Sequence, residues 1–333
     1  MRDRSRYRLV ASVLGLATVA LFILSLTVGP AGIAFGDSIA ALFSAKRDGI
    51  ALIMQEIRLP RAILGLMIGA TLGLSGAVLQ GYLRNPLAEP GLLGISASAS
   101  LGAVLAIYTG LSAAFPLGLP LAALAGAVVA VIVVQAMAGI RGGALTIILA
   151  GVAVTSFAGA MTSLALNLSP NPFAALEIMF WMLGSLTDRS MIHVWLAGPF
   201  MLVGCLMLAG LGRSLDALTL GSDAASSMGV EMRRVQFLAV FGTAAAVGAA
   251  TAVAGAIGFV GLVVPHILRP LVGARPSRLL PVSALGGACV LMAADILVRV
   301  IAPDRDLKLG VLTAIVGAPF FLWLVYRTRR SML

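Results

Sequence analysis

Long apolar runs separated by short polar segments occupy the chain from end to end. In the longest run, residues 235–268, only Gln236 and His266 are strongly polar. As one helix, this run would measure about 51 Å at about 1.5 Å per residue, whereas a bilayer core is about 30 Å thick. The pattern therefore predicts two membrane spans or a broken helix. A break costs least at three glycines and a proline: Gly255, Gly258, Gly261 and Pro265.

The remaining apolar runs predict eight further spans, which makes about ten for the whole chain. These runs cover residues 9–29, 62–80, 92–111, 121–138, 144–166, 191–211, 280–298 and 310–326. Only helices satisfy all backbone groups inside such single apolar segments. We therefore expect an all-α polytopic membrane protein, with residues 1–333 forming one transmembrane domain and with some helices short or broken.

The composition supports a chain embedded in a lipid bilayer. Hydrophobic residues make up 60% of the chain and charged residues only 11%, whereas soluble proteins carry about 25% charged residues. The net charge of +10 does not indicate nucleic-acid binding, because basic residues gather in the segments between spans. Most of them lie in alternate segments, and the positive-inside rule then predicts that both termini are cytoplasmic. We expect a multi-pass protein of the inner (plasma) membrane.

The chain shows no metal-binding pattern. Its two cysteines, Cys205 and Cys289, lie in the middle of apolar runs, without a second cysteine or a histidine at ligand spacing. We interpret both as small packing residues. The longest polar piece on the predicted cytoplasmic side is 212–234, and an amphipathic piece near 172–186 lies on the outer side.

Several long motifs, in the same order, resemble the permease family of ABC importers for iron-siderophore, haem and cobalamin. They are RLPRAILGLMIGATLGLSGAVLQ (58–80), RNPLAEPGLLGIS (84–96), GAIGFVGLVVPHILR (255–269), LLPVSALGGACVLMAADILVR (279–299) and GVLTAIVGAPFFLWL (310–324). The resemblance implies a homodimer, two copies of a cytoplasmic ABC ATPase and an external substrate-binding protein. ATP and Mg would be bound by the ATPase. This chain has no P-loop, so we expect it to bind no cofactor and to catalyse no reaction.

Three arginines near the outer ends of the spans are candidate docking residues for the external binding protein. By resemblance these are Arg58, Arg61 and Arg299, and a guanidinium pairs with carboxylates through two parallel hydrogen bonds. Two alternatives remain open. The arginines could anchor the helices at the membrane surface, and Asp295, one helical turn before Arg299, could form an ion pair with it.

The polar piece 212–234 resembles the coupling helices that contact the ATPase, although a solvated loop is the alternative. The candidate contact residues combine small side chains with one acid and two larger apolar residues. They are Leu218, Gly221, Asp223, Ala224, Ala225, Met228 and Gly229.

A cytoplasmic gate is implied by resemblance at two turns. Asn85 and Leu87 lie at the inner end of the second span, where a plain proline turn is the alternative, and Ala144 and Leu145 begin the fifth. The second pair departs from relatives that carry small hydroxyl residues there. Another departure is Asp306-Leu307-Lys308, where the family commonly has Glu-Leu-Pro.

We expect packing roles for His266 and for the aromatic and methionine side chains near the outer end of the fifth span. The latter, which could instead line a cargo entrance, are Met179, Phe180, Trp181 and Met182.

The predicted function is that of a permease subunit passing a metal chelate to the cytoplasm. Haem, cobalamin and ferric siderophores all remain possible cargoes. A secondary transporter, driven by an ion gradient and acting alone, is the main alternative, but it would need acidic residues inside the membrane, and only Asp295 comes near. An intramembrane enzyme would need a catalytic constellation that the spans do not contain.

Overall fold

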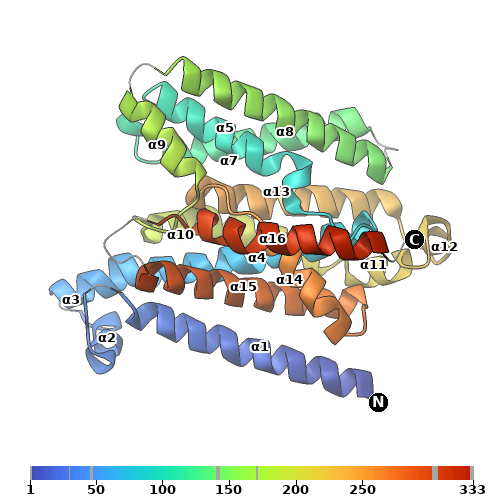
Figure 1. The fold of residues 1–333 in the computed structure, drawn as a ribbon, viewed down its shortest axis with the longest axis horizontal. Coiled ribbons are helices and arrows are strands. Elements are labelled where there is room, and N and C mark those ends of the chain that lie inside the picture. Colours follow the sequence, from blue (N-terminus) through green and yellow to red (C-terminus); the bar gives the residue numbers. More distant parts are fainter. Residues whose placement is uncertain are drawn as a thin grey trace.

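The computed structural model describes residues 2–29, 31–45, 48–139, 143–169, 172–301 and 307–330. Every regular element in these ranges is a helix (Figure 1). The α-helices are α1 (Arg2–Thr27), α2 (Phe35–Leu42), α3 (Gly49–Leu52), α4 (Leu59–Tyr82), α5 (Ile95–Tyr108), α6 (Leu111–Ala114), α7 (Gly118–Ala138), α8 (Ala144–Asn167), α9 (Pro172–Met182), α10 (Met191–Ala209), α11 (Gly212–Leu218), α12 (Ser222–Ser227), α13 (Met232–Ala254), α14 (Val260–Leu268), α15 (Pro276–Ile301) and α16 (Leu309–Arg330).

The all-α, membrane-spanning fold class is confirmed. Within the described residues, eight helical segments are long and apolar enough to cross a membrane, and the other two expected spans are the short helices α5 and α14. The expected span 92–111 is wrong in its extent, because α5 has 14 residues and measures only about 21 Å. A 3₁₀ turn, Pro90–Leu93, precedes it, and Gly94 separates the two in a left-handed conformation.

The long run 235–268 is broken, as its length requires. Helix α13 ends at Ala254, and α14 begins at Val260. Between them, Gly255 and Phe259 have positive φ angles of 73° and 67°. The break therefore includes Gly255 and Gly258, whereas Gly261 and Pro265 lie inside α14. A phenylalanine in the left-handed region is uncommon. Here Phe259 is the residue directly before α14.

Both described ends of the chain lie at the same end of the molecule, together with α11 and α12 (Figure 1). Helices α2, α3 and α9 lie at the opposite end. This arrangement agrees with an even number of crossings. The distribution of basic residues makes the end with the termini the cytoplasmic one, and we call the two ends inner and outer accordingly.

The second predicted span begins earlier than expected. The expected start at residue 62 is too late, because α3, a π-helical turn at Ile53–Arg58 and α4 form one continuous helical path. Arg58 and Arg61 therefore lie on a helix rather than on a loop. The π-helical turn widens the helix just before Pro60, whose ring cannot accommodate a regular preceding turn.

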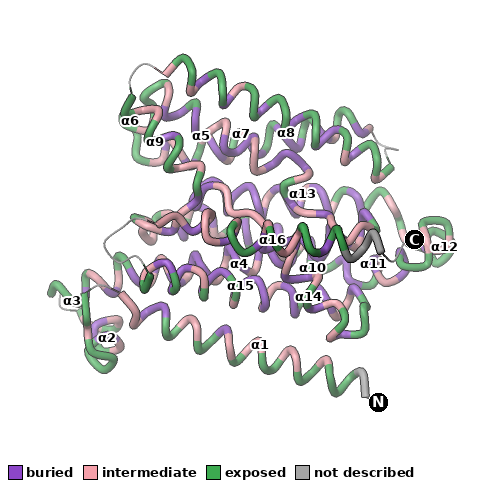
Figure 2. The backbone as a smooth tube through the Cα atoms, viewed as in Figure 1, coloured by how far each residue is buried: buried purple, intermediate pink, exposed green. Residues whose placement is uncertain are grey.

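Helix α4 is the centre of the bundle. It is buried along most of its length, whereas α1, α8 and α16 alternate buried with exposed positions (Figure 2). Glycines let its backbone touch its neighbours. A Cβ at Gly73 would meet the carbonyl oxygen of Ser283 in α15, and one at Gly76 would meet that of Gly261 in α14. Such small residues allow helices in a membrane to approach closely.

This packing predicts that Gly76→Ala strongly destabilises the protein. The added methyl group would overlap the backbone of α14, and overpacking of this kind costs about 1–3 kcal/mol or more. Gly159→Ala in α8 is the matched control, because its Cβ would meet nothing within 4 Å. Thermal unfolding in detergent should show a lower midpoint for Gly76→Ala only. Equal midpoints for the two variants would contradict the close contact.

Candidate docking and coupling sites

One carboxylate at the outer end joins two helices through two arginines. The Oδ1 atom of Asp295 lies 2.9 Å from Nη2 of Arg61 in α4, and its Oδ2 atom lies 2.8 Å from Nη2 of Arg299 in α15. Asp295 is only 2% exposed. The Asp295–Arg299 ion pair, considered above as an alternative role for Arg299, is present. The pairing with Arg61 was not foreseen, since the two residues are far apart in the sequence.

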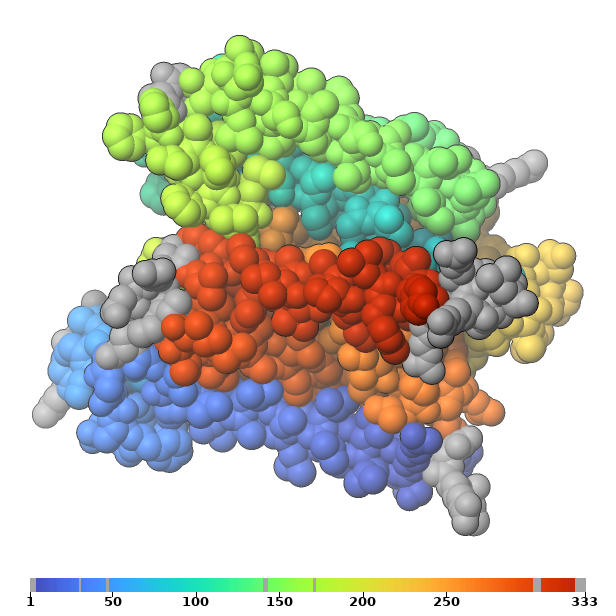
Figure 3. Space-filling view, viewed as in Figure 1, coloured from blue at the N-terminus to red at the C-terminus, as the bar shows by residue number. Residues whose placement is uncertain are grey.

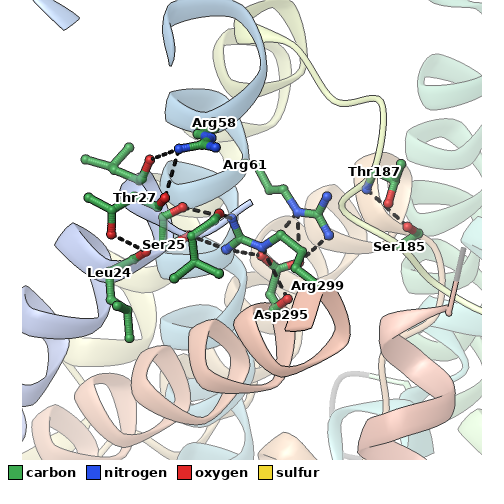
Figure 4. A network of polar contacts seen from close by, with 11 residues as sticks. Leu24, Ser25, Thr27, Arg58, Arg61, Ser185, Thr187, Asp295 and Arg299 are labelled. Atoms are coloured by element: carbon green, nitrogen blue, oxygen red, sulfur yellow. Dashed lines mark hydrogen bonds and ion pairs between the residues drawn. The ribbon is translucent and has the colours of Figure 1, made fainter. Parts of the chain in front are cut away.

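Arg58 and Arg299 also bind the outer end of α1 (Figure 4). Nη1 of Arg58 donates to the carbonyl oxygens of Leu26 and Thr27, at 3.1 and 2.9 Å. Nη1 of Arg299 donates to those of Ser25 and Val28, both at 2.8 Å. The last carbonyl groups of a helix lack partners within it, and cationic side chains near this end satisfy them.

The outer group therefore has a structural role, and it also keeps an excess of positive charge. Among the described side chains, Asp295 forms ion pairs with Arg61 and Arg299, whereas Arg58 donates to backbone carbonyl groups of α1 and has no carboxylate partner. Arg58 is 4% exposed and has the least access to a partner. The side chain of Arg61 is 14% exposed, which leaves it the more accessible member of the Asp295-bound pair.

At the inner end, α11 and α12 form a helical pair that projects from the bundle (Figure 1). The seven predicted coupling residues divide between its two sides. Asp223, Met228 and Gly229 are exposed, and Gly221 and Ala224 are half-buried.

Leu218 and Ala225 are not available for direct contact with an ATPase. They are 2% and 0% exposed and pack into the hydrophobic core, because they lie on the inward side of these short helices. Sequence reasoning also missed Leu220, which is 68% exposed beside Met228 at 63%. A helical period of apolar residues in the sequence would have indicated which side faces the bundle. Helices α11 and α12 have only seven and six residues, which is too few to show such a period.

Besides its apolar contacts, the helical pair is bonded to the bundle through one aspartate. Oδ1 of Asp216 in α11 accepts a hydrogen bond from the backbone N–H of Ser277 at 2.9 Å, and its Oδ2 accepts one from the hydroxyl group of Ser277. Ser277 lies in the first turn of α15, where backbone N–H groups lack helical partners. A displacement of α11 would therefore be transmitted to α15, which carries Asp295 and Arg299 at its other end.

The predicted gate residues lie at the inner ends of their helices. Oδ1 of Asn85 accepts the backbone N–H of Leu87 at 2.9 Å, so this segment forms a local turn after α4. Ala144 and Leu145 begin α8, and Leu145 is 69% exposed. The same turn continues to Glu89, whose Oε1 accepts the backbone N–H of Phe259 at 2.7 Å. This contact, also unforeseen, joins the turn to the break before α14.

The cysteines and His266 make packing contacts, whereas Met179 and Phe180 are exposed, at 55% and 53%, and Trp181 and Met182 are half-buried. Sγ of Cys205 contacts Thr71, and Sγ of Cys289 contacts Thr18, both side chain to side chain between helices. The His266 ring lies edge-on to Phe320, with 5.9 Å between ring centroids. Asp306 lies outside the described residues. No group of three potential metal ligands occurs in the described part of the chain.

The fold defines a polytopic helical membrane protein. It carries a buried arginine–aspartate group at its outer end and a projecting helical pair at its inner end. The model of the FecCD transport family matches residues 17–327. The chain belongs to this family.

Three relatives cover most of the chain. The Fe(3+) dicitrate transport system permease protein FecD of Escherichia coli is 39% identical, over 83% of this chain and 86% of its own length. The hemin transport system permease protein HmuU of Yersinia pestis is 35% identical over 99% of both chains. The vitamin B12 import system permease protein BtuC of Citrobacter koseri is 37% identical over 99% of this chain and 97% of its own.

A solved structure, an inward-facing conformation of a transporter assigned to the metal-chelate ABC type, superimposes with a TM-score of 0.84. It is 30% identical in sequence and covers 95% of this chain and 98% of its own. The homologues are transport permeases, so membership of the family agrees with a transport subunit rather than an enzyme.

Proposed function

We propose that this chain is the membrane permease subunit of an ABC importer. It receives a metal chelate from an external binding protein and passes it to the cytoplasm. Energy comes from ATP, which binds with Mg to a partner ATPase, and the chain itself holds no cofactor. The site of action is the plasma membrane, the inner membrane of a two-membrane cell. The cargo is haem, cobalamin or a ferric siderophore, as the names of the relatives suggest for those proteins.

One observation carries the proposal beyond family membership. At the inner end, outside the long helices, Leu220 and Met228 expose large apolar side chains on an otherwise polar helical pair. Apolar groups facing water are a typical mark of a protein interface. Asp223 and Gly229 accompany them on the exposed side. We assign this surface to the ATPase, with Leu218 and Ala225 supporting it from below.

The secondary-transporter alternative is disfavoured by the state of the acid it would need. Asp295 is bound by Arg61 and Arg299 at 2.9 and 2.8 Å. Both oxygen atoms of this carboxylate are therefore already engaged by the chain's own arginines, and neither is left free to bind a coupling ion. Asp295 also lies less than two helical turns from Ile301, the outer end of α15, rather than near the middle of this helix.

The proposal predicts that Met228→Glu prevents association with the ABC ATPase encoded as its partner. A carboxylate in the centre of an apolar contact would be desolvated without a counterion, and association should weaken at least about tenfold. Phe43→Glu, at an 86% exposed apolar position near the outer end, is the control and should bind normally. Co-purification and ATP hydrolysis measure the effect. Undiminished association of Met228→Glu would remove the surface from the proposal.

The permease acts as a homodimer in this proposal. Helices α8 and α16 expose rows of apolar side chains, among them Leu149, Phe157, Ile315 and Leu322. In Figure 3, α16 crosses the middle of the visible face below α8 and α9, with part of α5 visible between α16 and α8. A second copy covering this face would enclose a path between the two chains. Asn85, Leu87, Ala144 and Leu145 would then close it at the inner end.

The outer arginines dock the external binding protein. Their excess positive charge supports this role, with Arg61 and Arg299 receiving carboxylates while Asp295 holds them in place. Arg58 contributes mainly by fixing α1.

This role predicts opposite effects of two substitutions on the affinity for the binding protein. Arg61→Gln removes a cation and should weaken association about tenfold or more, whereas Asp295→Asn frees both arginines and should leave it equal or stronger. Both variants lose the Arg61–Asp295 ion pair, and Asp295→Asn also loses the Arg299–Asp295 pair. A purely structural role therefore predicts that Asp295→Asn is the more damaging of the two, which is the opposite of the docking prediction. Association with chains in nanodiscs should also weaken as salt is raised. If both variants weaken association equally, the arginines only stabilise the helices.

A further inference from the structure

A second polar site lies at the outer end, away from the Asp295 group. It is a cavity of about 420 Å³ between α9, the turn that follows it, and the starts of α7 and α16. Aromatic side chains, those of Phe180 and Trp181, form part of its wall, and Arg189 and Lys308 bring two cations to it. Neither the docking role nor the coupling role uses this cavity.

Two N–H donors in this wall have no partner in the described structure. The Nε atom of Arg189 and the Nε1 atom of Trp181 are both buried and form no hydrogen bond. Burial lowers the pKa of Arg189, while the neighbouring Asp188 raises it. Buried polar groups are nearly always hydrogen-bonded, and a buried donor left without an acceptor is destabilising. Two such donors on one cavity wall indicate that an acceptor, preferably an anionic one, completes the site.

The other charged side chains that line the cavity restrict the charge that a ligand can carry. Nζ of Lys308 lies 5.4 Å from the centroid of the Phe180 ring, an attractive cation–π arrangement. Glu177 and Asp188 also line the cavity. They would repel a ligand with many negative charges but tolerate a single anionic group directed at Arg189.

We propose that this cavity is a cargo subsite, which binds a carboxylate of an anionic, partly aromatic metal chelate at Arg189. The Trp181 N–H donates a second hydrogen bond, and Phe180 contacts the apolar part of the ligand. The inference rests on the proposed importer function and deepens it. It selects chelates that carry a carboxylate over otherwise identical chelates that do not.

The test compares two ligands that differ only in this group. Ferric protoporphyrin IX, with two carboxylates, and its dimethyl ester are titrated against the full chain in phosphatidylcholine nanodiscs by porphyrin absorbance. The iron and the porphyrin ring are common to both. The ester is more apolar, so the partition of each ligand into nanodiscs without the protein is measured and subtracted. The wild-type chain should prefer the diacid about tenfold or more, since a hydrogen bond to a charged group is worth about 1.5–3 kcal/mol.

Arg189→Gln should abolish this preference, and Arg189→Lys should keep part of it. Trp181→Phe, which retains an aromatic ring without the N–H, should reduce the preference. Arg275→Gln, at an exposed arginine near the inner end, is the control and should behave as the wild type.

Three results would overturn the proposal. The first is an equal preference in the wild type and Arg189→Gln. The second is displacement of the diacid by phosphatidylglycerol only in chains with Arg189, which would make a lipid phosphate the ligand. The third is that Arg189→Gln loses affinity for the external binding protein while its chelate binding stays as in the wild type.

This titration needs neither ATPase nor binding protein, so its outcome is independent of the importer function. An Arg189-dependent preference without ATP-driven uptake would contradict the proposed function and leave the site intact.

Discussion

Direct contact between helix backbones at glycines is the constraint on which the rest of the structure depends. Gly69 and Gly73 of α4 meet Gly287 and Ser283 of α15, and Gly76 meets Gly261 of α14. No side chain separates these helices, so van der Waals contact along α4 replaces the hydrophobic effect, which is absent between helices in lipid. The contacts between α4, α14 and α15 therefore leave no room for an added methyl group at these glycines.

A rigid centre gives the polar groups at both ends defined positions. At the outer end, α4 and α15 bring Arg61 and Arg299 to opposite sides of Asp295. At the inner end, the first turn of the same α15 holds α11 through Ser277 and Asp216. One helix thus connects the proposed binding-protein surface with the proposed ATPase surface. The short helix α14, tied to Glu89 at its start, lies between them.

Much of this could be predicted from the sequence, because apolar length is a strong signal in membranes. The run 235–268 is too long for one crossing, and its break falls at Gly255 and Gly258 as expected. The extents of α4 and α5 were not predicted. The π-helical turn before α4 and the 3₁₀ turn before α5 leave no periodic signal in the sequence. The sequence also gave no sign that Asp295 serves Arg61, that Ala225 is buried, or that Arg189 lacks a partner, because these depend on contacts between distant segments.

The most direct test of this account is the energy source of transport. The chain would be reconstituted in liposomes with its ATPase and its loaded binding protein, and uptake of the chelate measured with ATP and with imposed ion gradients. The account predicts uptake that requires ATP and the partners, persists when ionophores collapse all gradients, and is absent for the chain alone. Gradient-driven uptake by the chain alone would contradict it.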